Sequence, residues 1–129
     1  MDFDVLLDLM AQKKASDLFI TAGVAPSIKV NGVIMPVGKN KLTTEKAREV
    51  VEGVMDEGQV KEFHEHRELN FAISRKGVGR FRVSAFFQRN EAGMVLRRIE
   101  SKIPTVEELL LPPILNELSM TKRGIIIFV

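Results

Sequence analysis

The sequence predicts an α+β fold in which helices cover an antiparallel sheet. Three observations predict it. Apolar residues recur at helical spacing in some segments and alternate with polar residues in others, and the later alternating segments are joined by only a few residues. Short connections favour antiparallel neighbours. A chain of 129 residues that is 45% apolar can build one hydrophobic core.

Three helices are expected before residue 70. The first has apolar residues at i, i+3, i+4 and i+7, with Asp2 as a cap: Phe3, Leu6, Leu7 and Met10. The second follows a cap at Thr43 or Thr44 and carries the stripe Ala47, Val50, Val51, Val54 and Met55. The third follows Asp56, with Gln59 completing a capping box and Val60 and Phe63 facing inward.

Six strands are expected. One spans Asp17–Thr21, and Asn31-Gly32 predicts a two-residue hairpin between Ser27–Val30 and Val33–Met35. Three later strands are centred on Phe71–Ile73, on Arg80–Phe87 and on Met94–Ile99. Gly77, Gly79 and Gly93 are expected in the loops that join these three.

The last part reads as a connector and a strand. Pro104 and Thr105 predict another helix, because Glu108 completes a capping box, and Pro112-Pro113 ends it. One or two further turns are expected to pack through Ile114, Leu115 and Leu118. The run Ile125–Val129 is typical of a strand covered on both faces, so we expect it to enter a sheet of a longer protein. The alternative is that it adds a central strand to this domain's own sheet.

Composition favours a cytoplasmic protein. The chain has no cysteine, its first residues are acidic rather than basic as in a signal peptide, and no apolar run approaches the roughly 18 residues of a membrane span.

Basic residues are concentrated in one region. Between Arg75 and Arg98 there are seven basic residues and one acid, a charge of +6, whereas the rest has 12 basic and 16 acidic residues, a charge of −4. Arg80 and Arg82 alternate with Phe81 and Val83, so both guanidinium groups should lie on one sheet face. A phosphate or polyanion partner would explain this pattern. Cross-strand pairing with acids such as Glu68, Glu91 or Glu100 explains it equally well.

Arg97 and Arg98 lie on the next strand and should point to opposite faces, so at least one can join this cluster.

The sequence gives little support for a metal site or a catalytic site. His64 and His66 are two residues apart on a helix and point away from each other, so no metal site is expected. The chain has neither a nucleophile elbow nor a P-loop, and is not expected to be an enzyme by itself.

A nucleic-acid interface is a weaker alternative. Lys76-Gly77-Val78-Gly79-Arg80-Phe81-Arg82-Val83 matches the sheet-based RNA-binding signature at Lys76, Gly77 and Gly79, and lacks its stacking aromatic residues. No nucleic acid partner is therefore expected.

Taken together, five segments resemble the type IV pilus retraction ATPases, the PilT/PilU family of secretion motors. They are Ala15–Gly23, Ser27–Gly32, Gly79–Phe86, Val95–Ile99 and Lys122–Val129, in the family's order. The resemblance implies a PAS-like N-terminal domain at residues 1–101, a linker at 102–123, and at 124–129 the first strand of a RecA-like ATPase domain that continues beyond this chain.

The same resemblance implies a function. The full-length protein would be a cytoplasmic, homo-hexameric ATPase at the inner-membrane pilus machinery, using ATP and Mg²⁺ to drive pilus retraction and twitching motility. Arg80, Arg82, Arg97 and Arg98 match family arginines that approach the nucleotide phosphates. Many family members have histidine at the position of Phe19. Phenylalanine at this position resembles the PilU-type branch, and that resemblance implies a companion retraction ATPase. A free-standing PAS-like sensor or interaction module is the alternative function.

Overall fold

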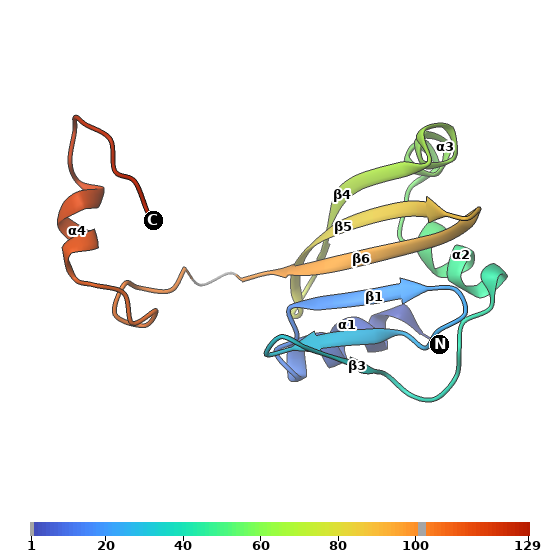
Figure 1. The fold of residues 1–129 in the computed structure, drawn as a ribbon. Helices are drawn as coiled ribbons and strands as arrows, with labels where there is room; N and C mark the ends of the chain where they lie inside the picture. Colours follow the sequence, from blue (N-terminus) through green and yellow to red (C-terminus); the bar gives the residue numbers. More distant parts are fainter. Residues whose placement is uncertain (1, 101–102) are drawn as a thin grey trace.

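The computed structural model of the chain describes residues 2–100 and 103–129. Its elements are, in chain order, α1 (Phe3–Gln12), β1 (Asp17–Thr21), β2 (Ser27–Val30), β3 (Val33–Pro36), α2 (Thr44–Glu52), α3 (Glu57–His66), β4 (Glu68–Arg75), β5 (Gly79–Gln88), β6 (Glu91–Ile99) and α4 (Ile114–Ser119). The strands form one antiparallel sheet in the order β3-β2-β1-β6-β5-β4 (Figure 1), which confirms the predicted α+β class.

The first three helices begin at the caps that the sequence predicts. Asp2 accepts a hydrogen bond from the backbone of Asp4 at 3.0 Å, and Thr43 accepts one from the backbone of Lys46 at 3.2 Å. At α3, the side chains and backbones of Asp56 and Gln59 form both hydrogen bonds of the capping box. Each cap satisfies an amide that the helix itself leaves without a partner.

The core lies between one face of the sheet and helices α1, α2 and α3. Six strand residues point into it with no exposed surface: Leu18, Ile20, Phe81, Val83, Met94 and Leu96. Phe63 of α3 is equally buried. Burying one such side chain contributes about 1.5–3 kcal/mol relative to leaving it exposed. These apolar side chains therefore determine which face of the sheet packs against the helices.

The predicted hairpin between β2 and β3 is confirmed. Asn31 and Gly32 adopt φ angles of 49° and 82°, the left-handed values that a two-residue turn of this kind requires. All four residues of β3 are exposed, as expected for an edge strand. Pro36 fits that position because it lacks the N–H group that a central strand would need.

The expectation that Gly93 lies in a loop is wrong. Gly93 is buried within β6, and the β5–β6 turn is made by Arg89 and Asn90, whose φ angles are 50° and 67°. A Cβ atom at position 93 would lie 3.0 Å from the Phe86 ring and 3.2 Å from the carbonyl oxygen of Ile20. The glycine is therefore required by close packing and not by a turn.

The connector is less regular than the sequence predicts. The predicted capping box is present, since Thr105 and Glu108 exchange both hydrogen bonds, at 3.0 and 3.2 Å. The turn it starts does not continue as a helix, because Leu110 adopts a φ of 54°, which the α-helix does not allow. α4 supplies the further turns that the sequence predicts, but no residue in it is fully buried: Leu115 and Leu118 are half-buried and Ile114 is exposed.

Residues 125–129 form no strand and are exposed, so they do not join this domain's own sheet. The two edge strands of the described sheet are β3 and β4, and residues 125–129 pair with neither of them. The predicted boundary between domain and linker, at residues 101 and 102, lies outside the described residues.

Replacing Phe81 tests the sidedness of β5. We expect Phe81→Ala to lower the free energy of unfolding by about 3–5 kcal/mol, because it leaves a cavity in a fully buried site. Arg80→Ala, one residue earlier and exposed, should change it by about 0.5 kcal/mol at most. Urea unfolding measures both, and equal losses would contradict the assigned faces.

Candidate functional site

The face of the sheet opposite the helices carries the predicted arginines. Because β5 alternates, the burial of Phe81 and Val83 under the helices places Arg80 and Arg82 on the other side, where both are exposed. We call this side the open face. The prediction that these two guanidinium groups share one sheet face is confirmed.

The register of the strands brings a third arginine beside them. Arg97 of β6 pairs directly with Arg82 of β5, and Asp17 of β1 pairs with Arg97 on its other side. Lys29 of β2 pairs with Asp17 in turn. Residues opposite one another on adjacent strands point to the same face, so these four side chains form one row across the open face.

Arg98 lies on the other side of the sheet. It pairs in register with Phe81, which faces the helices, and its guanidinium group lies 3.8 Å from the Glu100 carboxylate. The open face therefore brings together Arg80, Arg82 and Arg97, and it does not include Arg98.

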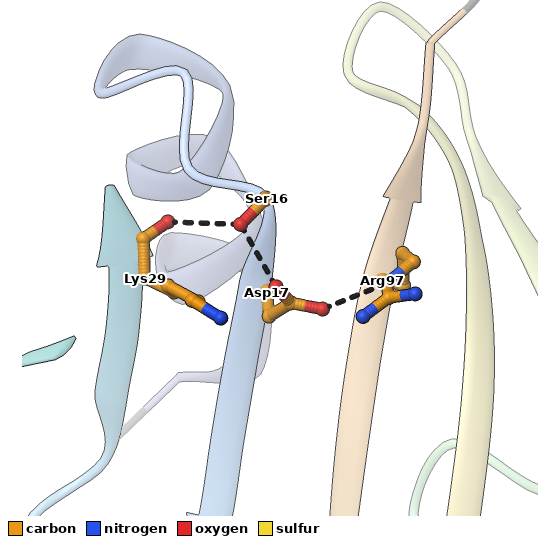
Figure 2. A network of polar contacts seen from close by, with 4 residues as sticks. All are labelled: Ser16, Asp17, Lys29 and Arg97. Carbon is orange, nitrogen blue, oxygen red and sulfur yellow. Dashed lines mark hydrogen bonds and ion pairs between the residues drawn. The ribbon is translucent and has the colours of Figure 1, made fainter. Parts of the chain in front are cut away.

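Asp17 is held by its neighbours on both sides (Figure 2). The Arg97 Nε donates to Asp17 Oδ1 at 2.9 Å, and the Ser16 hydroxyl donates to Asp17 Oδ2 at 2.8 Å. The same hydroxyl lies 3.4 Å from the carbonyl oxygen of Lys29. The Asp17 side chain is 5% exposed and that of Arg97 is 66% exposed, so the carboxylate is buried and its arginine partner is not.

Two opposing effects set the pKa of Asp17. Burial raises the pKa, because it disfavours the charged form. The hydrogen bonds from Ser16 and Arg97, with the positive charges of Arg97 and Lys29, lower it by more. The pKa of Asp17 therefore lies below its ordinary value, and the carboxylate is ionised at neutral pH.

A shallow hollow of about 360 Å³ opens on this face. It is lined by Asp17, Asn70, Arg82, Ser84, Val95 and Arg97. Among the residues that the structure describes, Arg80 and Arg82 make no ion pair, and Arg97 makes its ion pair through Nε. The hollow thus presents free guanidinium N–H groups, which match the oxygens of phosphate or carboxylate groups.

Two of the acids that could have paired with these arginines bind other residues. Glu91 accepts a hydrogen bond from the Thr44 hydroxyl at 2.8 Å, and Glu100 pairs with Arg98. Cross-strand pairing does occur, but its carboxylate is Asp17. The sequence offers no signal for this choice, because it depends on β1 lying next to β6.

The two histidines lie where a solvated helix face predicts. His64 Nε2 is 2.9 Å from Glu52 Oε1 and His66 is exposed. Within residues 2–100 and 103–129, no cluster of three potential ligands could hold a metal ion. The helices in the same ranges include none that is long and apolar enough to cross a membrane.

Comparison with known proteins gives this face a context. Over all 129 residues the chain is 64% identical to the type IV pilus ATPase PilU of Pseudomonas aeruginosa, of which it covers 34%. Over 127 residues it is 36% identical to the retraction ATPase PilT of the same organism, of which it covers 37%. The chain belongs to the PilT/PilU family of type IV pilus ATPases. It spans about a third of the length of these relatives.

Solved structures agree with this membership. The crystal structure of the pilus retraction motor PilT with bound ADP matches 96% of the chain and 36% of PilT, with a TM-score of 0.78 and 30% identity. The matching part is the N-terminal domain of PilT. The ATPase DotB of Legionella pneumophila, at a TM-score of 0.65 and 18% identity, shares the fold. A scan of protein-family models finds no match.

The Asp17–Arg97 pair should make stability depend on pH. A lowered pKa in the folded state stabilises the protein above the ordinary aspartate pKa of about 3.9, and this contribution is lost as the pH falls through the folded value. Because Arg97 is mostly exposed, the ion pair is weakened by solvent. We therefore expect the free energy of unfolding of the wild type to exceed that of Asp17→Asn by only about 1 kcal/mol at pH 7.

Chemical denaturation between pH 7 and pH 2 measures this difference, which should narrow below about pH 4. Asp8→Asn, an exposed carboxylate on α1, is the matched control and should change the free energy of unfolding by about 0.5 kcal/mol at most. A gap between wild type and Asp17→Asn that stays constant to pH 2 would contradict the assigned ion pair.

Proposed function

We propose that this chain is the N-terminal domain of a type IV pilus retraction ATPase and that its open face meets the phosphates of ATP. The observation that carries the proposal is the row in which Arg82 and Arg97 lie directly opposite each other, with Arg80 on the same face. The family membership supplies the context, since the relative PilT has been solved with bound ADP.

The residues present fit a polyphosphate. Two like charges opposite each other on a sheet repel, and an exposed structural face gains nothing from that arrangement. The arginines face away from the core and are exposed, so no helix among the described residues covers them. A nucleotide supplies several negative phosphate oxygens, and planar guanidinium groups bind such oxygens through paired hydrogen bonds.

The physical role proposed for these side chains is electrostatic. Fixed guanidinium groups stabilise negative charge on phosphate oxygens, and they do so most strongly where the site excludes water. A domain that supplies them couples its own position to the presence of nucleotide, because it gains these contacts only when it closes over the phosphates. The proposal assigns this role to Arg80, Arg82 and Arg97 and leaves Arg98 outside it.

The finer assignments extend the proposal to the whole protein. Residues 1–101 would be the domain, 102–123 the linker and 124–129 the first strand of a RecA-like ATPase domain, whose P-loop would follow. The exposed apolar residues 125–129 support this, because such a run is stable only when covered on both faces. The whole protein would be a cytoplasmic homo-hexamer that uses ATP and Mg²⁺ and acts with a companion retraction ATPase at the inner-membrane pilus machinery.

The sensor alternative has less support from the packing. A ligand-sensing domain needs an interior pocket, and the centre of the core is filled by fully buried side chains such as Phe63, Phe81 and Met94. A hollow of about 600 Å³ does lie between α1, α2 and β4, but it opens at the surface, and charged residues such as Lys46 and Glu49 contribute to its lining.

ATP hydrolysis by the protein extended through the reading frame after Val129 tests the proposal. We expect the extended protein to hydrolyse ATP and the 129-residue chain not to do so. In the extended protein, Arg82→Gln should lower kcat/KM by about 100-fold or more, the size typical of a lost transition-state charge contact.

Arg89→Asn is the matched control, because it removes the same charge from the turn between β5 and β6, where asparagine tolerates the positive φ. It should keep kcat/KM within about twofold of wild type, as is usual for a surface change away from the site. An extension without a P-loop, or normal turnover by Arg82→Gln, would end the proposal.

A further inference from the structure

Asp17 stands out among the described residues as the one charged side chain that is buried. The residue as a whole is 4% exposed, and it lies on the open face rather than in the apolar core. Burying a carboxylate is costly unless hydrogen bonds and an opposite charge compensate. Asp17 has both, since it accepts hydrogen bonds from Ser16 and Arg97 and lies near the positive charges of Arg97 and Lys29.

The contact leaves most of the Arg97 guanidinium free. Asp17 Oδ1 accepts from Nε at 2.9 Å, and this uses one of the five N–H groups of the side chain. The terminal nitrogens, which carry the other four, have no hydrogen-bond partner among the described residues. A hydrogen bond at Nε fixes the base of the planar group and directs its outer edge away from the carboxylate.

The other side of Asp17 is fixed as well. Ser16 donates to Oδ2 at 2.8 Å, which stops the carboxylate from rotating (Figure 2). The two hydrogen bonds therefore link the start of β1 to the side chain of Arg97, in the row that also contains Arg82.

We propose that Asp17 is a positioning residue, whose oxygen orients the Arg97 guanidinium so that its outer edge binds a phosphate group together with Arg82. The inference rests on the proposed function, in which the open face meets nucleotide phosphates. The gain is preorganisation, since a free arginine side chain loses considerable rotamer entropy when a ligand fixes it.

The negative charge of Asp17 opposes the same ligand, so an experiment must separate geometry from charge. Asp17→Asn and Asp17→Ala both remove the charge, but only asparagine keeps an oxygen that can accept from Arg97. Asparagine fits the site because the Ser16 hydroxyl can accept from its amide nitrogen and donate to the carbonyl oxygen of Lys29, which lies 3.4 Å away.

The test is calorimetric titration of the 129-residue chain with inorganic tripolyphosphate at low salt. We expect Asp17→Asn to bind tripolyphosphate about three- to tenfold more tightly than Asp17→Ala, the range expected for one preorganising hydrogen bond. The same comparison in an Arg97→Ala background should give equal affinities. A purely structural role for Asp17 would produce no difference that depends on Arg97.

The outcomes separate the inference from the proposed function. If Arg97→Ala binds tripolyphosphate as wild type does, or wild type does not bind it, the phosphate role of this face is overturned. If Arg97→Ala weakens binding while Asp17→Asn and Asp17→Ala bind equally, only the positioning role is overturned. Should Asp17→Ala fail to fold, Asp17→Ser replaces it, because its shorter side chain cannot reach Arg97 and the same comparisons apply.

Discussion

The two-residue alternation of β5 is the constraint on which the rest of the structure depends. One strand has to serve two environments, and the burial of Phe81 and Val83 beneath the helices decides which residues remain outside. Since burying each such side chain contributes about 1.5–3 kcal/mol, slipping the strand by one residue would move the apolar set into water and the arginines into the core. The positions of Arg80 and Arg82 on the open face thus follow from the stability of the opposite face, and need no contact of their own.

Strand order adds what alternation alone cannot provide. Because β6 lies between β5 and β1, Arg97 meets Arg82 on one side and Asp17 on the other. The carboxylate is buried and doubly hydrogen-bonded, whereas the guanidinium stays mostly exposed, so the pair anchors one partner and leaves the other available. This combination explains how three arginines can share a small surface without ligand, and why that surface still suits an anion.

Local signals in the sequence predicted most elements of the fold, because caps, the Asn31-Gly32 turn and apolar spacing all act within a few residues. The failures were of two kinds. Gly93 looks like a loop residue, yet its small size is demanded by the Phe86 ring of the neighbouring strand, a contact that only the three-dimensional structure reveals. Thr105 and Glu108 do form their capping box, but a cap cannot extend a helix that has no core to pack against. The site was likewise predicted only in part. Alternation along one strand placed Arg80 and Arg82 on the same face. The contact of Asp17 with Arg97 depends on the pairing of strands about 80 residues apart in the chain, which local patterns do not reveal.

The most direct test of the account is a structure of the extended protein with ADP or a non-hydrolysable ATP analogue bound. The account predicts phosphate oxygens about 3 Å from the guanidinium nitrogens of Arg82 and Arg97, with the Arg97 Nε still donating to Asp17. A structure in which nucleotide is bound while the open face of a closed domain remains in solvent, or packs only on protein, would contradict it.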